Sequence, residues 1–218
     1  MKITVIITAY KDRGWLDDAI ISAKNQTFED YDIILTSDGD AGLSKYATRH
    51  GIDFCYTHKN SWVTAMNKAV DMAKGEWIKV LNDDDLLTKN CLKDLYNNRG
   101  DMVYGNDIIF NGTEKLYCPP ADITIKNLLP LIKNPIPFPT VLFKKDVLLA
   151  VGGFDPEIPL ASDYDFYINL LTHGFTISYC NSVVAKYRIH GNMYSKTYKM
   201  SERKRIKDYM VKKYKGCL

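Results

Sequence analysis

Hydrophobic and polar positions along the first hundred residues predict strands and helices in alternation. Compact apolar runs predict strands at 3–7, 31–40, 53–58, 76–81 and 101–105. Apolar side chains at helical spacing predict helices at 17–26, 42–51, 61–76 and 92–100, with Gly51 and Gly75 ending two of them. Strands that alternate with helices of this length are typical of βαβ units and a parallel sheet covered on both faces.

The pattern changes after about residue 105. A hairpin is predicted around Asn111-Gly112, and the proline-rich segment 128–140 is predicted to be a loop. We expect a strand, a short helix and a glycine turn across 140–155, an amphipathic helix across 162–174, and late strands at 175–180 and 183–190. The fold class is therefore α/β, with a mostly parallel central sheet flanked by helices and a mixed C-terminal region.

No linker interrupts the chain, so the sequence predicts one domain over residues 1–218. We expect a nucleotide-type α/β sheet over 1–105, a mixed region built onto it over 106–195, and a basic C-terminal helix over 196–218. The formal net charge is +3, but the segment Lys196–Lys215 carries nine basic residues against Glu202 and Asp208. The segment is thus +7 and the remainder −4, and a mildly acidic body argues against a nucleic-acid partner.

Few features of the sequence bear on membrane association or on the cellular compartment. No run of 18 apolar residues predicts a transmembrane helix, and the N-terminus is typical of a first strand rather than a signal peptide. Five scattered cysteines favour free thiols in a reducing compartment, so we expect a cytoplasmic protein. The basic tail is amphipathic, and it either docks on the domain or makes peripheral contact with the cytoplasmic face of an anionic membrane. The chain is also compatible with being one domain of a longer protein.

Polar residues follow three of the predicted parallel strands at their carboxyl ends, where ligands bind in open α/β sheets. These residues are Thr8-Ala9-Tyr10, Ser37-Asp38-Gly39, and Asn82-Asp83-Asp84-Asp85. A GxGxxG fingerprint and a GxxxxGK[ST] phosphate loop are both missing from the sequence. A nucleotide at this edge would therefore be held by carboxylates and an aromatic side chain, with a metal ion on its phosphates.

Three adjacent carboxylates at the end of a buried strand repel one another unless a cation or a solvated turn relieves them. A hard divalent cation takes oxygen ligands, often one or two carboxylates together with substrate phosphates. With Asp38 expected nearby, the cluster favours a metal site. The alternative is that Asp84 or Asp85 caps the next helix, and we assign Asp85 to that role.

Six stretches occur together in an order and spacing that are characteristic of one family: "VIITAY", "AIISAKNQTFEDYDIILTSDGD", "AMNKAVDMAKGEWIKVLNDDDLL", "GGFD", "SDYDFYINL" and "YRIHGNMYS". In these stretches, which span roughly residues 3–195, the chain resembles the GT-A glycosyltransferases of family 2. The resemblance implies transfer of a sugar from a nucleotide-sugar, with a metal ion bound at a D-x-D-type site.

The resemblance assigns nucleotide-binding roles by position. Thr8, Ala9 and Tyr10 would line the nucleobase, Tyr10 by stacking, while Asp38 would accept a hydrogen bond from the base. Asn67 matches a family asparagine on the helix before the metal strand, and it could equally be a polar helix residue that bonds a loop. Ser37 and Ser61 depart from the family pattern, which bears on the nucleotide preference.

The D-x-D position is occupied by Asn82-Asp83-Asp84. The resemblance makes Asp84 the direct metal ligand, with Asn82 and Asp83 contacting ribose or metal-bound water. Arg188 and His190 share one face of the last strand by alternation. The family places this histidine near the diphosphate or the metal, and Lys186 could join both residues in an electrostatic wall.

Asp163 stands at the position of the family's catalytic base. A carboxylate there would take the proton of the acceptor hydroxyl. The alternative is that Asp163 caps the helix that follows, and the helix N-terminus would keep its pKa low. Asp165 is interpreted as structural. Trp62, Phe138 and Tyr164 could offer aromatic faces to a sugar, although packing in the core or loop is the favoured interpretation for each.

The resemblance implies Mn²⁺ or Mg²⁺ as cofactor and a UDP-sugar as donor, UDP-glucose-like as the first choice. The acceptor would be a glycan, a lipid-linked or a protein-linked saccharide, and the reaction would be inverting. Two alternatives stay open from the sequence. One is a sugar nucleotidyltransferase, although "TAYKDRGW" matches its glycine-rich loop poorly. The other is a nucleotide-sugar or carbohydrate-binding domain without catalysis.

Overall fold

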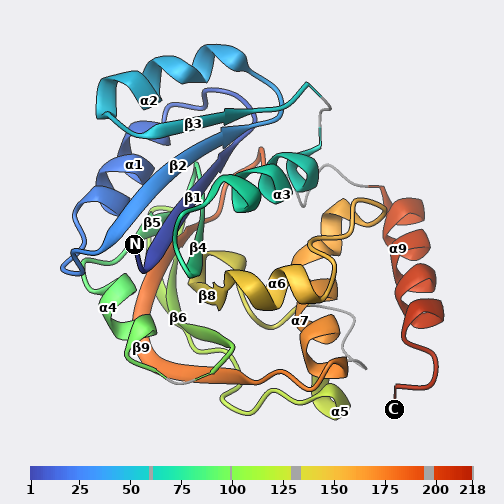
Figure 1. Cartoon of the computed structure of the whole chain (residues 1–218). Helices are drawn as coiled ribbons and strands as arrows, with labels where there is room; N and C mark the ends of the chain where they lie inside the picture. Colours follow the sequence, from blue (N-terminus) through green and yellow to red (C-terminus); the bar gives the residue numbers. More distant parts are fainter. Residues whose placement is uncertain (59–60, 99, 129–133, 194–198, 218) are drawn as a thin grey trace.

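A nine-stranded mixed sheet forms the framework of the chain in a computed structural model that describes residues 1–58, 61–98, 100–128, 134–193 and 199–217 (Figure 1). The strands are β1 (Ile3–Ala9), β2 (Tyr31–Ser37), β3 (Asp53–Tyr56), β4 (Trp77–Asn82), β5 (Leu86–Leu87), β6 (Met102–Phe110), β7 (Glu114–Tyr117), β8 (Val141–Lys144) and β9 (Ile177–Arg188). Their order is β3-β2-β1-β4-β8-β6-β9-β5, and β7 pairs with β6.

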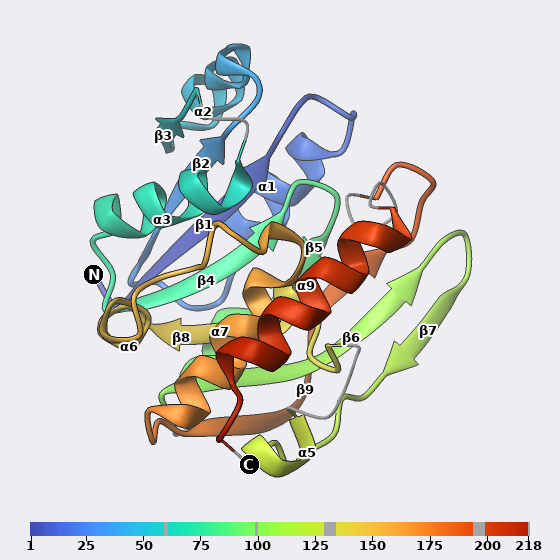
Figure 2. The same ribbon diagram turned by 90° about the vertical axis from the view of Figure 1, so that its right-hand side faces the viewer.

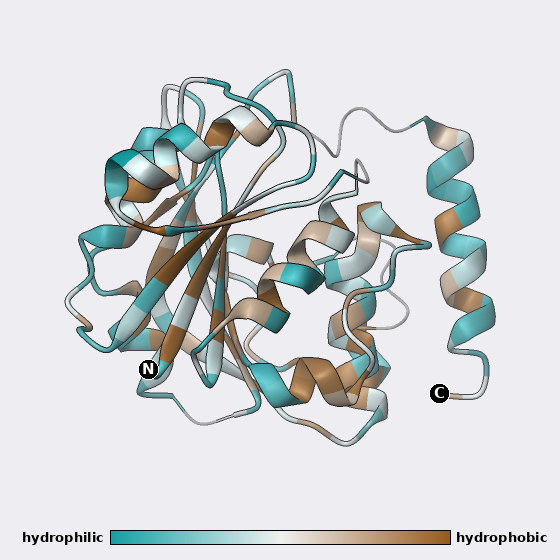
Figure 3. Cartoon of the chain, turned by 45° about the horizontal axis from the view of Figure 1, so that its top comes forward, coloured by the Kyte–Doolittle hydropathy of each residue, from teal (hydrophilic) through white to brown (hydrophobic). Residues whose placement is uncertain are grey.

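The helices are α1 (Leu16–Lys24), α2 (Ser44–His50), α3 (Trp62–Met72), α4 (Cys91–Tyr96), α5 (Ile125–Leu128), α6 (Lys145–Ala150), α7 (Ser162–Thr172) and α9 (Met200–Lys213). Apolar residues of α1, α2 and α4 form one buried cluster with the strands, and those of α3, α6, α7 and α9 form the other. Helices therefore cover both faces of the sheet, as Figure 1 shows, and Figure 3 shows the apolar strands between them. The predicted α/β class is confirmed.

The parallel part of the sheet is built from β3, β2, β1 and β4. Thr8 of β1 lies opposite Thr36 on one side and Asn82 on the other. The carboxyl ends of these strands therefore meet at one edge, as the sequence predicts. Beyond β4 the sheet is mixed, because β8 runs antiparallel to both β4 and β6.

Several element boundaries differ from the sequence prediction. The hairpin at Asn111-Gly112 is present, but its first strand is continuous with the strand predicted at 101–105, so the expected boundary at 105/106 falls inside β6. The two late strands are likewise one strand, β9, with register shifts against β6 between Gly105 and Asp107. Helix α3 ends at Met72, before Gly75. Much of the proline-rich loop, residues 129–133, lies outside the described residues.

Helix α9 packs its apolar side on the domain, next to α7 (Figure 2). Ile206, Met210 and Tyr214 are buried, whereas the exposed side is mostly basic, and Figure 3 colours the helix largely hydrophilic. The docked interpretation of the tail is therefore the one that the structure shows. Within the described ranges, no helix combines the length and apolar character needed to cross a membrane.

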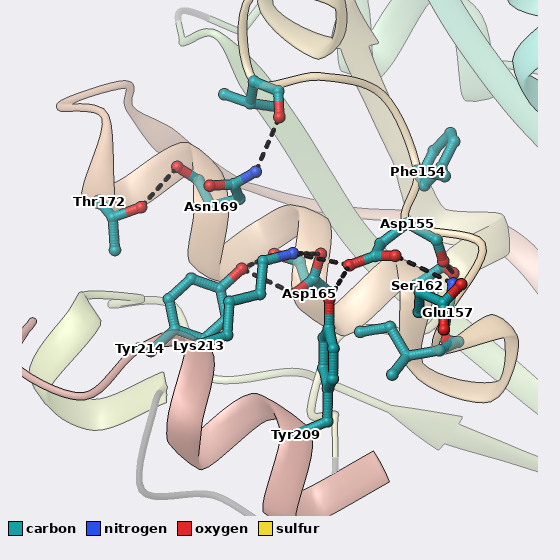
Figure 4. Close-up of polar contacts among 12 residues, drawn as sticks. Phe154, Asp155, Glu157, Ser162, Asp165, Asn169, Thr172, Tyr209, Lys213 and Tyr214 are labelled. Atoms are coloured by element: carbon teal, nitrogen blue, oxygen red, sulfur yellow. Dashed lines mark hydrogen bonds and ion pairs between the residues drawn. The ribbon is translucent and has the colours of Figure 1, made fainter.

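A polar network between α9 and α7 anchors this helix (Figure 4). The Lys213 ammonium lies 2.9 Å from the Asp165 carboxylate and 3.0 Å from that of Asp155. The hydroxyls of Tyr214 and Tyr209 donate to Asp165 and Asp155 at 2.7 and 2.9 Å. Asp165 is only 1% exposed, and burial raises its pKa although Lys213 and Tyr214 oppose the shift. The structural interpretation of Asp165 fits these contacts.

Replacing Lys213 by Met should lower the free energy of unfolding by about 3 kcal/mol, because it leaves the buried Asp165 carboxylate without its cation. Urea unfolding followed by circular dichroism measures this change. Lys212→Met removes the same charge from an exposed position of the same helix and should change stability by less than about 0.5 kcal/mol. Equal stability of the two variants would contradict the role given to Lys213.

Candidate active site

The polar ends of β1, β2 and β4 form the first part of the site. The Thr8 hydroxyl donates to the Asn82 side chain at 3.3 Å, and the Asp83 N–H donates to the Thr8 carbonyl at 3.0 Å. Backbone pairing places Ala9 opposite Ser37, directly before Asp38. The structure therefore gathers the predicted residues of all three strand ends at one edge.

Tyr10 and Asp38 lie close together beside Gly39. The Tyr10 side chain is 53% exposed, and its ring approaches Gly39 so closely that a Cβ there would lie 2.5 Å from ring carbons. Only glycine permits this approach. Asp38 is buried, and burial raises its pKa. An open aromatic face beside a shielded carboxylate is suited to stacking and hydrogen bonding of a base, and the assignment of both residues to the nucleobase stays a prediction.

The acidic turn after β4 is closed by its own hydrogen bonds. The Asn82 amide donates to Asp85 at 2.9 Å, and the Arg188 N–H donates to the other Asp85 oxygen at 2.8 Å. The prediction of Asp85 as a helix cap is wrong, because α4 begins only at Cys91 and Asp85 is buried beneath the turn. Burial, and then the charge of Asp84, raises the pKa of Asp85 well above its ordinary value.

Arg13, in the loop after β1, is the cation of this cluster in the structure, and the sequence analysis missed it. Its guanidinium donates to both oxygens of Asp83 and lies 3.3 Å from an oxygen of Asp84. It also donates to the Asn192 carbonyl at 3.3 Å. Burial raises the pKa of Asp83 to about 6, although Arg13 opposes that shift. The positive charge in "TAYKDRGW" was the available signal, but its partner lies 70 residues away.

His190 approaches Asp84 from the end of β9. The His190 Nε2 lies 2.9 Å from Asp84 Oδ2, and its ring packs on Trp15 with 4.6 Å between centroids. The predicted metal ligands Asp84 and His190 are therefore neighbours. Neighbouring ligands of an octahedral Mg²⁺ or Mn²⁺ ion are about 3 Å apart, so this pair fits two positions of such an ion.

The residues that the structure describes do not by themselves provide a full coordination shell. Among the described residues, no group of three or more His, Cys, Asp or Glu side chains is arranged to hold a metal ion. A hard divalent cation often binds through one or two protein ligands together with substrate phosphates and water. The donor set at Asp84 and His190 is compatible with that mode of binding.

Arg188 supports the acidic turn from below. Its Nε donates to the Asp84 carbonyl at 2.9 Å, and its guanidinium lies over the rings of Trp15 and Phe110, at 5.0 and 4.5 Å from their centroids. Lys186 pairs with Glu114 of β7 at 2.7 Å. Arg188 and Lys186 are thus engaged by other protein groups, and the expected electrostatic wall is reduced to the neighbourhood of His190.

Asn67 spans from α3 to the glycine turn before α7. Its amide donates to the Phe154 carbonyl at 2.9 Å, and its oxygen accepts from the Phe154 N–H at 3.0 Å. Gly153 allows this close approach, with φ at +81°. The structure therefore favours the alternative interpretation of Asn67, a polar helix residue that bonds a loop, over a nucleotide contact.

Asp163 lies in the first turn of α7, and the helix is capped by Ala161 without a side-chain bond. The Asp163 carboxylate accepts hydrogen bonds from the Asn134 amide and the Tyr164 N–H, both at 2.8 Å. Burial nevertheless raises its pKa to about 6. The expectation of a low pKa is wrong, because desolvation outweighs the helix terminus and these donors.

Lys79 ties β4 to the chain just before β8. This lysine of β4 is fully buried, and its ammonium donates to the carbonyls of Val80, at 2.9 Å, and Pro139. Burial lowers its pKa to about 8. A cation with two carbonyl partners inside the sheet ties the chain before β8 to the strand that ends at the acidic turn.

Tyr187 of β9 lies between the two halves of the site. Burial raises the pKa of its hydroxyl. Four nearby carboxylates raise it further, those of Asp85, Asp84, Asp163 and Asp107. The acidic turn and the candidate base therefore both lie near this one residue. Tyr187 was missed because the sequence analysis considered only the other face of this strand.

The aromatic residues Trp62, Phe138 and Tyr164 pack in the protein, as the favoured interpretation states. Trp62 donates to the Pro159 carbonyl at 2.8 Å and packs against Phe138, and Tyr164 donates to the Leu128 carbonyl at 2.5 Å.

Comparison with known proteins identifies the family. The model of the family described as glycosyl transferase family 2 matches residues 4–120, more than half of the chain. The chain belongs to glycosyl transferase family 2. The matched range contains the three strand ends, Arg13 and the acidic turn, whereas Asp163, Tyr187 and His190 lie beyond it.

Curated relatives agree with this family. The O-antigen biosynthesis glycosyltransferase WbnJ of Escherichia coli is 28% identical over 215 residues, covering 89% of this chain and 82% of that protein. An uncharacterized glycosyltransferase of Rickettsia felis is 27% identical over 89% of this chain. The chain spans 35% of that protein and 64% of a second relative, from Rickettsia typhi.

Solved structures show the same fold. The 1–349 fragment of Staphylococcus aureus TarS in complex with UDP-GlcNAc superposes with a TM-score of 0.75 at 16% identity, over 97% of this chain and 66% of that fragment. The mannosyltransferase PcManGT of Pyrobaculum calidifontis, in complex with GDP-Man and Mn²⁺, gives 0.67 at 14% identity, over 88% of this chain and 58% of that protein. The family 2 chain therefore has the GT-A fold that the sequence predicts.

Arg13→Met should destabilise the metal-free protein more at pH 8 than at pH 5. The folded-state pKa of Asp83, about 6, exceeds the ordinary 3.8, so the contribution of this group to stability is lost as pH rises through that window. Without Arg13 the folded-state pKa rises further, and the loss extends to higher pH. We expect a cost of about 3 kcal/mol at pH 8 in urea unfolding with EDTA present.

Lys11→Met is the matched control, because it removes a positive charge from an exposed position in the same loop. It should leave stability nearly unchanged at both pH values. An Arg13→Met variant with the same cost at pH 5 and pH 8 would contradict the role of Arg13 as the counter-ion of ionised carboxylates.

Proposed function

We propose that this family 2 chain transfers a hexose from a nucleotide-diphosphate sugar to a saccharide acceptor, with inversion at the anomeric carbon. The observation that supports the proposal is that the acidic turn and Asp163 both lie close enough to Tyr187 of β9 for their charges to act on its hydroxyl. A leaving diphosphate would occupy the side of Asp84, and the incoming hydroxyl the side of Asp163. Opposite placement of these groups is what direct displacement requires.

The donor is most consistent with a UDP-sugar, UDP-glucose-like in the first instance. Tyr10 offers an open ring and Asp38 a shielded carboxylate for the base, and Thr8 and Ala9 would line the base as well. Asn82 and Asp83 would contact the ribose or metal-bound water. TarS, which shares the fold, is described in complex with UDP and with UDP-GlcNAc, and PcManGT with GDP-Man. These complexes support a nucleotide-sugar, and the choice of UDP is part of the proposal.

Asp84 and His190 would hold Mn²⁺ or Mg²⁺. The ion, when bound, would neutralise the diphosphate as that group leaves. Arg13 keeps Asp83 paired, and Arg188 keeps the turn in place through the Asp84 carbonyl. PcManGT is described in complex with Mn²⁺, which supports a divalent ion at a GT-A site.

Asp163 is the candidate general base. A pKa of about 6 leaves roughly nine-tenths of the carboxylate ionised at pH 7, and it matches the proton-accepting task better than an ordinary aspartate does. The Asn134 amide holds one oxygen, so the carboxylate keeps one orientation toward the acceptor. Asp163 takes the proton of the acceptor hydroxyl as the bond to the sugar forms.

The acceptor in this proposal is a glycan, a glycolipid or a glycoprotein. Peripheral contact with an anionic membrane stays a prediction, and it would use the exposed basic side of α9, because the apolar side packs on the domain.

Asp163→Asn should reduce transfer at least a hundredfold while nucleotide-sugar binding is retained, because the amide cannot accept the proton. Asp84→Asn is the complementary variant, and it should lose the Mn²⁺-dependent part of nucleotide binding. Binding is measured by isothermal titration calorimetry, and transfer by released nucleotide and by mass of the product. Retention of more than about a tenth of the activity in Asp163→Asn would contradict the assignment of the base.

A further inference from the structure

The face of the mixed sheet that carries Tyr187 holds a second polar residue, Asp107. Asp107 of β6 pairs with Ala185 of β9, and Ile109 pairs with Tyr187. Directly paired residues point to the same face of a sheet, so Asp107 and Tyr187 share one face, two positions apart. Tyr117 of β7, which also pairs with Asp107, lies on this face as well.

This face looks toward the candidate active site. Burial raises the pKa of the Tyr187 hydroxyl, and the charges of the acidic turn and of Asp163 raise it further. The Tyr117 hydroxyl donates at 2.9 Å to the carbonyl of Pro135, next to the residue that holds Asp163. Arg188, which points to the opposite face, packs on Phe110 instead. Alternation along β9 therefore places Arg188, which supports the acidic turn, and Tyr187 on opposite faces of the strand.

The side-chain oxygens of Asp107 and Tyr187 have no hydrogen-bond partner in the described part of the chain. Both Asp107 oxygens are buried and unpaired, and the side chain is only 1% exposed. A buried carboxylate without a donor is costly, and burial raises its pKa to about 6. Buried polar groups are nearly always satisfied in folded proteins, so an unsatisfied carboxylate beside a candidate active site requires an explanation.

We infer that Tyr187 and Asp107 form a subsite for the hydroxyl groups of the transferred sugar. A phenol donor and a carboxylate acceptor side by side match a polyhydroxylated ring, which presents both acceptors and donors. Tyr187 lies near both the acidic turn and Asp163. In the proposed displacement the sugar must sit between the groups that these two parts of the site hold. This inference rests on the proposed function and adds a residue pair that selects the sugar rather than the nucleotide.

Tyr187→Phe should keep the affinity for UDP within about twofold in the presence of Mn²⁺. Its affinity for UDP-glucose relative to UDP should fall by about fivefold to tenfold, the usual effect of one hydrogen bond. Tyr179→Phe is the matched control, because it makes the same change at the far end of β9, where the hydroxyl bonds Asn106. The control should leave the affinity ratio unchanged. Isothermal titration calorimetry measures both ligands for each variant.

Asp107→Asn provides a second test, which distinguishes sugar binding by this carboxylate from a purely structural role. Because the carboxylate has no partner to lose, the melting temperature at pH 8 should stay level or rise, while the affinity ratio and the transfer rate fall at least fivefold. A drop in melting temperature with an unchanged affinity ratio would overturn the role of Asp107. Unchanged ratios in both variants would overturn the inference.

The binding results that would overturn the proposed donor differ from those that would overturn the sugar subsite. If the wild-type protein binds neither UDP nor UDP-glucose with Mn²⁺, the proposed donor is wrong and the subsite is overturned with it. If the wild-type protein binds both and Tyr187→Phe shows the same ratio, the sugar subsite alone is wrong and the proposed function stands.

Discussion

The compensation of three adjacent carboxylates is the interaction on which the rest of the site depends. Asp83, Asp84 and Asp85 would repel one another at the end of β4, yet each finds a different partner. Arg13 pairs with Asp83, His190 with Asp84, and the Arg188 N–H with Asp85. These partners come from the loop after β1 and from β9, so neutralising the turn also fixes the two chain segments that border it.

The part of the site that contains Asp163 is held by packing and polar contacts on the other face of the sheet. Helix α7 delivers Asp163, and its position depends on Asn67 at the glycine turn and on Lys213 of α9. Lys79 lies on the strand of the acidic turn and donates to the Pro139 carbonyl, so it ties this strand to the chain that follows Asn134. Burial of these groups is what shifts their pKa values, so the chemistry of the site follows from how the layers close around it.

Local patterns predicted the part of the site that depends on strand ends. Apolar runs and the rule for parallel sheets were enough to bring Thr8, Asp38 and Asp84 to one edge. Long-range contacts were beyond that reasoning, because Arg13 and Asp83 are distant in sequence and Asp85 was interpreted only from its neighbours. The pKa of Asp163 was mispredicted because a helix terminus is visible in a sequence but the extent of burial is not. Tyr187 and Asp107 share one face because β6 and β9 pair along their length, and the sequence pattern does not reveal this pairing.

The central claim is that Asp84 and His190 bind a divalent ion together with the diphosphate of a nucleotide. Pulsed electron paramagnetic resonance of Mn²⁺ with the protein and UDP tests it most directly, because the spectrum reports the nuclei bound to the ion. The account predicts phosphorus couplings from the diphosphate and a nitrogen coupling that disappears in His190→Gln. A spectrum identical to that of Mn²⁺ and UDP without protein would contradict it.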